Sequence, residues 1–421
     1  MNALVRLFLS EDEKSIKKNS SIWNMCFSLL TSFQSAIMIL LVTRCVGADG
    51  AGVMSIAFAA AYLMFTIGCY GVRNFHSTDV LNKYSYRDYR SVRIVTCILM
   101  ICASFVYSVF KGYQGEKAII VFGICALKLA EVAEDLFHGE LQRNGRLDIA
   151  CFLGTVRLII MYLTFGILLI SGKSLIIAVM TIVLISVGFV IYESSYLRES
   201  ILNTEPILLK NIKQIFYYNF PLFFTSFLNI YITNAPKYAI DSCLSNGEQA
   251  YYAVLSMPAF VINLMSGVIY RPLLTAMALK WEQHEKKEFG KMVLKQFLAI
   301  VAITIVVCVG GRLIGLRILE KLYGLQLMQY MEVFILLLIS GGMTAALNFG
   351  IVCLTIIRKQ KMMTALSGVT VLLAIYISEK LVMAWGLMGA AGLNMVLVLL
   401  EFVVVLVAIY RYIFLKHKNK Y

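Results

Sequence analysis

The sequence predicts an all-α integral membrane protein with twelve transmembrane helices. Of its 421 residues, 60% are hydrophobic and 15% are charged, and the mean hydropathy is +0.79. Soluble domains have about 45–50% apolar and about 25% charged residues, so a soluble core could not hide this much apolar side chain. The apolar residues stand in long unbroken runs, not in the alternating pattern of barrel strands. The composition therefore excludes a soluble enzyme, a disordered chain and a secreted disulfide scaffold.

A membrane-spanning helix needs about 20 mainly apolar residues, and twelve segments of the chain meet that need. The predicted spans are 21–43, 51–71, 93–110, 117–137, 149–170, 174–194, 216–237, 250–271, 292–310, 330–355, 363–384 and 387–411. No connecting loop is long enough to hold a soluble domain. The first run is too long for the apolar core of a cleavable signal, so it is expected to remain as the first span.

The loops carry the charge asymmetry that orients membrane proteins. Counted along the chain, 27 Lys and Arg residues fall on the side of the N-terminus and 9 on the opposite side. Basic residues concentrate in cytoplasmic loops, so both termini are expected in the cytoplasm. This bias accounts for the net charge of +14 without nucleic-acid binding. The ten cysteines lie mostly in apolar stretches and the four histidines are scattered, so no metal or cofactor site is expected.

The chain reads as two similar halves, residues 1–196 and 216–421, joined by a cytoplasmic linker over 197–215. A cation ends the first span of each half, and an arginine follows the second span of each half. These residues are Arg44 and Lys237, then Arg73 and Arg271. Six spans return the chain to its starting side, so both halves share one orientation. Halves of this kind are related by an axis along the membrane normal, and a transported molecule then binds between them.

Two stretches of sequence carry a resemblance to a known family. They contain Val42-Thr43-Arg44 with Gly71-Val72-Arg73-Asn74, and Asn219-Phe220-Pro221-Leu222 with Asn234-Ala235-Pro236-Lys237-Tyr238-Ala239-Ile240-Asp241 and Gln249-Ala250-Tyr251-Tyr252. In these motifs and in span number the chain resembles the polysaccharide biosynthesis proteins that flip lipid-linked oligosaccharides. Those proteins, the O-antigen and capsule repeat-unit translocases, belong to the multidrug/oligosaccharidyl-lipid/polysaccharide (MOP) exporter superfamily.

The resemblance implies a MATE-like bundle of two six-helix halves in the bacterial cytoplasmic membrane. It implies transport without enzymatic activity, moving an undecaprenyl-pyrophosphate-linked oligosaccharide outward by alternating access for capsule, exopolysaccharide or O-antigen assembly. Other polysaccharide-assembly membrane proteins are possible partners. For such cargo, Arg44, Arg73, Lys237 and Arg271 are candidate pyrophosphate ligands, because arginine and lysine both bind phosphate. The alternative is that these four cations only anchor helix ends at the membrane surface.

Charged residues inside a span are costly and mark functional positions. The fourth span contains Lys128, Glu131 and Asp135, which share one helical face, together with Glu134. The fifth span contains Arg157 at a depth that allows pairing with Glu131 or Asp135. These residues form either a salt-bridge lock between the two spans or part of the cavity lining, with Lys128 and Arg157 as further anion ligands.

Two acidic residues of the second half are candidates for ion coupling or ion pairing. Glu401 lies near the middle of the twelfth span, where it either titrates during transport or bonds a backbone group. Asp241 is the last residue of the Asn-Ala-Pro-Lys-Tyr-Ala-Ile-Asp motif at 234–241.

Two other functions compete with the flippase. A MATE-type efflux carrier for organic cations needs acidic groups in its lumen, whereas this chain has surplus cations at its helix ends. A membrane polysaccharide polymerase or ligase needs a sizeable outer loop or catalytic constellation, and the sequence offers neither.

Overall fold

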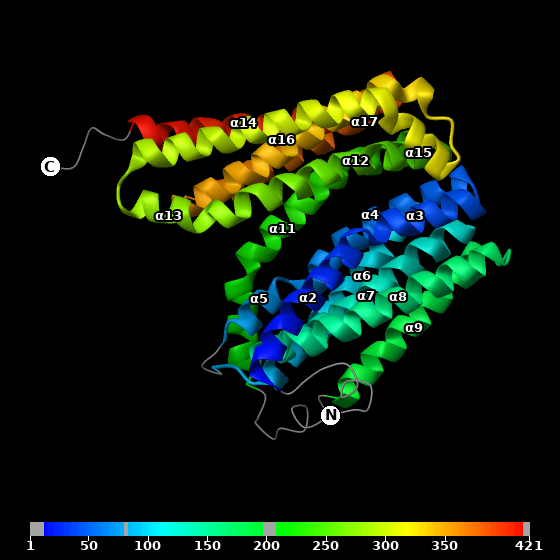
Figure 1. Cartoon of the computed structure of the whole chain (residues 1–421). Coiled ribbons are helices and arrows are strands. Elements are labelled where there is room, and N and C mark those ends of the chain that lie inside the picture. Colours follow the sequence, from blue (N-terminus) through cyan, green and yellow to red (C-terminus); the bar gives the residue numbers. More distant parts are fainter. Residues whose placement is uncertain (1–11, 80–82, 197–207, 360, 416–421) are drawn as a thin grey trace. The chain divides into compact units, whose positions relative to one another are not determined.

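The computed structural model describes residues 12–79, 83–196, 208–359 and 361–415, and every regular element within these ranges is a helix (Figure 1). The chain divides into two compact units, Met1–Ile230 and Tyr231–Tyr421. One long helix, α11 (Leu209–Cys243), belongs to both. Residues 197–207 of the predicted linker lie outside the described residues, and residues 209–215 are the start of α11.

The first unit is a bundle of helices (Figure 1). Its helices before α11 are α2 (Glu13–Ser32), α3 (Gln34–Cys45), α4 (Ala48–Cys69), α5 (Val72–Ser77), α6 (Tyr86–Phe110), α7 (Gly115–Arg143), α8 (Leu147–Ile170) and α9 (Leu175–Tyr196). α2 and α3 meet at a bend of 46° around Phe33. The first predicted span therefore consists of two helices.

α4 and α7 form the centre of this unit. α4 is rich in alanine, and Ala57, Ala59 and Ala60 are fully buried. Small side chains allow membrane helices to approach closely. α7 contacts α4, α6, α8 and α9, and a Cβ added at Gly123 would lie 2.6 Å from Val179 of α9. Because α7 is surrounded by protein, its charged side chains stay out of the lipid.

The second unit contains the end of α11 and the remaining helices. These are α12 (Asn246–Tyr270), η1 (Arg271–Leu273), α13 (Leu274–Glu282), α14 (Lys286–Gly310), η2 (Gly311–Gly315), α15 (Leu316–Tyr323), η3 (Met328–Tyr330), α16 (Met331–Ile356), α17 (Lys361–Tyr410) and η4 (Arg411–Leu415). α16 contacts α12, α14 and α17.

α17 contains the last two predicted spans. Its path breaks at Gly386, whose φ of 55° and ψ of −134° are not helical and suit a residue without a Cβ. The break falls between the predicted spans 363–384 and 387–411. Ala374 before the break and Leu393 after it share a core with Ile232 of α11, so both arms pack on the same helix.

The membrane fold predicted from the sequence is confirmed. Among the described residues, eight helices are long and apolar enough to cross a membrane, and the bent α2–α3 pair is a ninth. Every predicted span overlaps a helix. The count of twelve stays a prediction, because α7 and α11 are more polar and α17 is continuous across its break.

Candidate functional site

α7 carries the densest group of buried charged residues in the first unit. Between positions 128 and 140 it contains Lys128, Glu131, Glu134, Asp135, His138 and Glu140, all buried except Asp135, which is half-buried. Successive helical residues are 100° apart, so Lys128, Glu131 and Asp135 share one face of α7, as predicted, at different heights along the helix. The charged side chains form separate clusters with different neighbouring helices.

The Lys128 cluster joins α7 to the bend between α2 and α3. The Nζ atom of Lys128 lies 2.7 Å from Oε2 of Glu131 and also donates to Oε1 of Gln34. Gln34 in turn donates from Nε2 to Oε1 of Glu131 at 2.8 Å. Lys128 also lies 4.7 Å from the centre of the Tyr62 ring. All hydrogen-bonding groups of this pair are thus satisfied inside the protein, which is the condition for burying an ion pair.

Arg157 of α8 forms a bidentate ion pair with Glu134. Its Nε and Nη2 atoms lie 2.9 and 2.8 Å from the two carboxylate oxygens, and both side chains are buried. Glu131, one of the two predicted partners, lies 3.9 Å from Arg157. The predicted alternative Asp135 is wrong, because its position on the helix turns it toward α5 and α6.

The Asp135 cluster contains two arginines and one carboxylate. Arg93 of α6 lies 2.9 Å from Oδ2 of Asp135 and donates to the carbonyl oxygen of Gly68 at 2.6 Å. Arg73 of α5 lies 3.1 Å from Oδ1 of Asp135 and 3.4 Å from Oε1 of Gln142. The side chain of Arg73 is 29% exposed and that of Arg93 is 3% exposed. The cluster therefore has one surplus positive charge, and the exposed member that carries it is Arg73.

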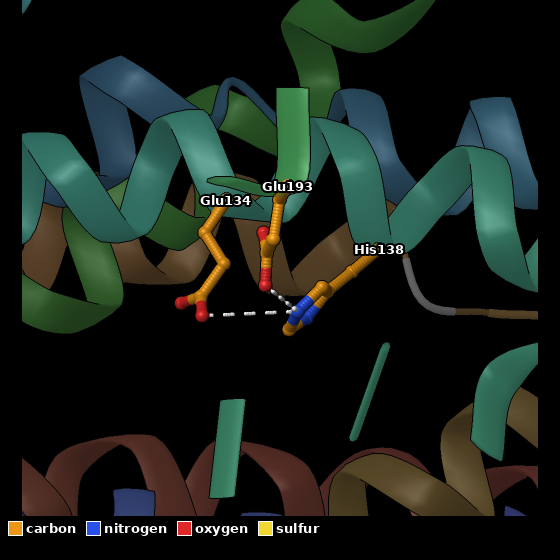
Figure 2. A group of neighbouring side chains, drawn as sticks. All are labelled: Glu134, His138 and Glu193. Atoms are coloured by element: carbon orange, nitrogen blue, oxygen red, sulfur yellow. Dashed lines mark ion pairs between the residues drawn. The ribbon is translucent and has the colours of Figure 1, made fainter. Parts of the chain in front are cut away.

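The His138 cluster brings α7 and α9 together. The Nε2 atom of His138 lies 3.8 Å from Glu134 and 3.7 Å from Glu193 of α9. Figure 2 shows the imidazole and both carboxylates directed toward one another. All three side chains are buried. Sequence reasoning missed His138 and Glu193, because residues 55 positions apart show no ligand spacing along the chain.

A further buried cluster lies at the α5 end of the unit. Nε2 of His76 lies 2.8 Å from Glu140, which also pairs with Arg143 at 2.7 Å. The His76 ring stacks on Tyr89 at 4.1 Å. Burial lowers the pKa of His76 below its ordinary value, although the neighbouring Glu140 carboxylate acts in the opposite direction. The neutral imidazole is therefore favoured in the folded protein.

The remaining predicted residues lie apart from these clusters. Arg44 is exposed at the end of α3. In the second unit, Lys237 is half-buried and Arg271 is exposed, and among the described residues neither makes a hydrogen bond or an ion pair. Asp241 is half-buried near the end of α11. Glu401 is buried on the second arm of α17, where the hydroxyl groups of Ser367 and Thr370 of the first arm lie against it.

The charged clusters around α7 thus include two regions of opposite charge. The Asp135 cluster is positive and partly accessible, which suits binding of an anion. The His138 cluster, with Arg157, is negative and buried, which suits binding of a cation. The sequence identifies Arg73, Asp135 and Arg157 as candidates but not Arg93, because Arg93 is the first residue of a predicted span, where a cation is typical of the membrane boundary.

No protein-family model and no curated protein matches the chain. Solved structures match it over most of its length. A structure described as lipid II flippase MurJ in an inward closed conformation superposes with a TM-score of 0.70 at 14% identity, covering 91% of this chain and 87% of that one. An inward-facing multidrug resistance MATE family transporter of the MOP superfamily gives 0.65 at 11% identity, covering 91% and 96%.

A third structure is a MOP superfamily transporter from Pyrococcus furiosus, described as having a binding pocket of reversed polarity. It gives a TM-score of 0.53 at 14% identity and covers 98% of this chain and 99% of that one. At these identities the similarity establishes the fold. The chain is a multi-pass, all-helical membrane protein with the fold of MOP superfamily transporters.

Proposed function

We propose that the protein is a flippase for polyprenyl-pyrophosphate-linked oligosaccharides. The observation that carries this proposal is the Asp135 cluster, in which Arg73 and Arg93 share a single carboxylate. A pyrophosphate is a multivalent anion, and an arginine fork matches its oxygens. Arg73 is the partly exposed member and can exchange Asp135 for a phosphate oxygen.

The second unit supplies cations that suit the same cargo. Lys237 and Arg271 form no ion pair with any described residue, so each is available to an anion. Lys237 is also half-buried, which strengthens its electrostatic interactions relative to water. The similarity to the MurJ structure supports a lipid-linked substrate, because that protein is described as a lipid II flippase.

The proposal extends to location and partners. We infer that the protein lies in the bacterial cytoplasmic membrane with both termini inside, and that it acts without catalysing a reaction. Its partners in this proposal are the lipid-linked oligosaccharide, membrane lipid and other polysaccharide-assembly membrane proteins.

A second candidate function is ion-coupled efflux of organic cations. The observation that favours it is the buried carboxylate of Glu193, which lies in a cluster with a surplus negative charge. The similarity to a multidrug resistance MATE transporter is compatible with this candidate. The flippase is preferred because Arg73, a cation, is the more accessible charged residue of the Asp135 and His138 clusters.

A transport experiment separates a substrate contact of Arg73 from a structural one. Arg73→Ala is expected to lower oligosaccharide flipping at least tenfold in proteoliposomes, about the effect of losing one charge-assisted bond of 1.5–3 kcal/mol. Arg73→Ala leaves Asp135 paired with Arg93, so a loss of flipping at an unchanged Tm assigns Arg73 to the pyrophosphate. If Arg73 is only structural, through its bonds to Asp135 and Gln142, flipping and Tm fall together. Lys173→Ala, an exposed cation of a distant loop, is the control and keeps full activity.

Normal flipping by Arg73→Ala, or a loss of flipping that a fall in Tm accompanies, would therefore remove Arg73 from the binding site. In cells, deletion of the gene is expected to trap the lipid-linked sugar in the cytoplasmic leaflet. A deletion that changes only drug sensitivity would favour efflux instead.

A further inference from the structure

The His138 cluster has the composition of a transition-metal site. Glu134 and His138 stand one helical turn apart on α7, a spacing that places two ligands on one face. Glu193 supplies a third donor from α9. The ligand atoms of the three residues lie within 4.8 Å of one another, and Figure 2 shows all three side chains converging on one point.

Two of the three side chains of this cluster, His138 and Glu193, have ligand atoms that the protein does not satisfy. The distances of 3.7 and 3.8 Å from His138 Nε2 to the two carboxylates are too long for hydrogen bonds. Among the described residues, Nε2 of His138 and both carboxylate oxygens of Glu193 are buried without a hydrogen-bond partner. Orphaned buried polar atoms cost free energy. A ligand that contacts all of these atoms would satisfy them.

The charges of the cluster show the sign of that ligand. Glu134 and Glu193 carry two negative charges and Arg157 carries one positive charge, since the Arg157 guanidinium pairs with Glu134. The nearby Lys128 and Glu131 cancel each other. Because Glu193 is only 2% exposed, water cannot compensate the remaining negative charge. A buried unpaired charge is strongly destabilising, so the ligand that suits the cluster is a cation.

The imidazole determines the class of cation. Mg²⁺ and Ca²⁺ take oxygen ligands only, whereas an imidazole with carboxylates suits Zn²⁺ and its first-row neighbours. Two ligands on one tetrahedral zinc ion lie about 3.4 Å apart, close to the distances observed. The Arg157 fork holds Glu134 in place as hydrogen bonds commonly do for ligating carboxylates.

We propose that Glu134, His138 and Glu193 bind a divalent transition-metal ion of the zinc class, which fastens α9 to α7. Binding of the divalent ion changes the net charge of Glu134, Glu193 and Arg157 together from one negative to one positive. A hydroxide or another anion in the fourth ligand position neutralises it. This site is independent of the transport proposal, because none of its three ligands is a pyrophosphate candidate.

Metal content and thermal unfolding of the full chain in detergent test this site. The protein is purified with a tag that contains no histidine, stripped with chelator, and exposed to ZnCl₂, with MgCl₂ and CaCl₂ as oxygen-ligand controls. We expect about one bound zinc ion per chain, a higher Tm with zinc alone, and at least tenfold weaker zinc binding in His138→Ala and Glu193→Gln, the loss typical of disturbed metal sites. His76→Ala removes another buried histidine that contacts a glutamate of α7 and is expected to keep the zinc.

Glu193→Gln adds a test that survives partial misfolding of the other variants. Without metal it is expected to be more stable than the wild type, because it removes the uncompensated charge. With zinc the order reverses, because only the wild type gains from binding. A wild type whose zinc content equals that of both variants, or whose Tm responds to pH but not to zinc at any pH between 6 and 8, would overturn the proposal. The second result would assign the cluster to a proton alone.

Discussion

At the scale of single residues, the first unit depends on charges that neutralise each other inside the bundle. The Arg157–Glu134 pair shows the principle, because two parallel hydrogen bonds satisfy a buried guanidinium that lipid could not solvate. Such a pair adds little net stability when intact, but removal of one partner leaves an uncompensated buried charge.

Arg157→Ala is therefore expected to destabilise the protein by about 3–5 kcal/mol. In protein stripped of metal, addition of Glu134→Gln should recover part of that loss, because the stranded carboxylate is then neutral. A double-mutant cycle on thermal unfolding in detergent measures this coupling. Additive effects of the two substitutions would show that the pair does not stabilise the fold.

The sequence was sufficient to identify these residues as buried charges but not to pair them. Lys128, Glu131 and Arg157 stand out because charged residues are rare in apolar runs. Asp135 lies on the face of Lys128 and Glu131, as predicted, but further along α7, where it pairs with Arg73 and Arg93. A single helical position, 100° of rotation, decides between Glu134 and Asp135 as the partner of Arg157. A hydropathy pattern does not determine the rotation of a helix against its neighbours closely enough to make that choice.

His76 makes the stability of the first unit depend on pH. Burial lowers its pKa in the folded protein, so between that value and about 6.5 the unfolded chain binds more protons than the folded one. Stability is complete above about pH 6.5 and falls as the pH decreases through this range. The groups around the ring are Glu140 and Arg143 of α7 with Arg93 and Tyr89 of α6.

His76→Gln is expected to flatten the dependence of Tm on pH between 5 and 7. Gln keeps a side chain that can donate to Glu140 but does not titrate. The same slope in the wild type and the variant would mean that another group is responsible.

At the scale of helices, glycine positions determine how closely the helices pack. At Gly341 of α16, an added Cβ would lie 2.8 Å from Cα and 2.9 Å from the carbonyl oxygen of Ala259 in α12. Both contacts are with backbone, which cannot rotate away. At Gly392 of α17 an added Cβ would meet no atom within 4 Å.

Gly341→Ala is accordingly expected to cost about 1–3 kcal/mol through overpacking. Gly392→Ala, the matched control, should leave stability unchanged or raise it by up to about 1 kcal/mol, because alanine has the higher helix propensity. Thermal unfolding of both variants in one detergent gives the comparison. Equal Tm values for the two would contradict the close approach of α12 and α16.

The helices themselves were largely predictable, and the breaks between them were not. Apolar runs fixed the position of each predicted span, because burial in lipid needs length and hydropathy alone. No proline or glycine adjoins Phe33, so the sequence does not predict the bend there. Gly386, by contrast, falls at the predicted boundary between the last two spans. α11 begins at Leu209, inside the predicted linker 197–215, because a helix that leaves the membrane does not have to end at the membrane surface.

At the scale of the whole molecule, basic loop residues predict the orientation in the membrane. A cysteine-free variant with Asn144→Cys, in the turn between α7 and α8, should react with an impermeant maleimide only after cells are opened. Lys173→Cys, in the turn between α8 and α9, should react in intact cells. Both positions are exposed, so accessibility to the reagent depends on the membrane side. The reverse pattern would invert the predicted topology.

The most direct measurement is transport by the purified chain in proteoliposomes. Lipid-linked pyrophosphate oligosaccharide and an organic cation such as ethidium are supplied in parallel. We expect movement of the oligosaccharide between leaflets, with a large loss in Arg73→Ala at an unchanged Tm, and no uptake of ethidium. Uptake of ethidium without movement of the oligosaccharide would contradict the proposed function and would favour efflux of cations.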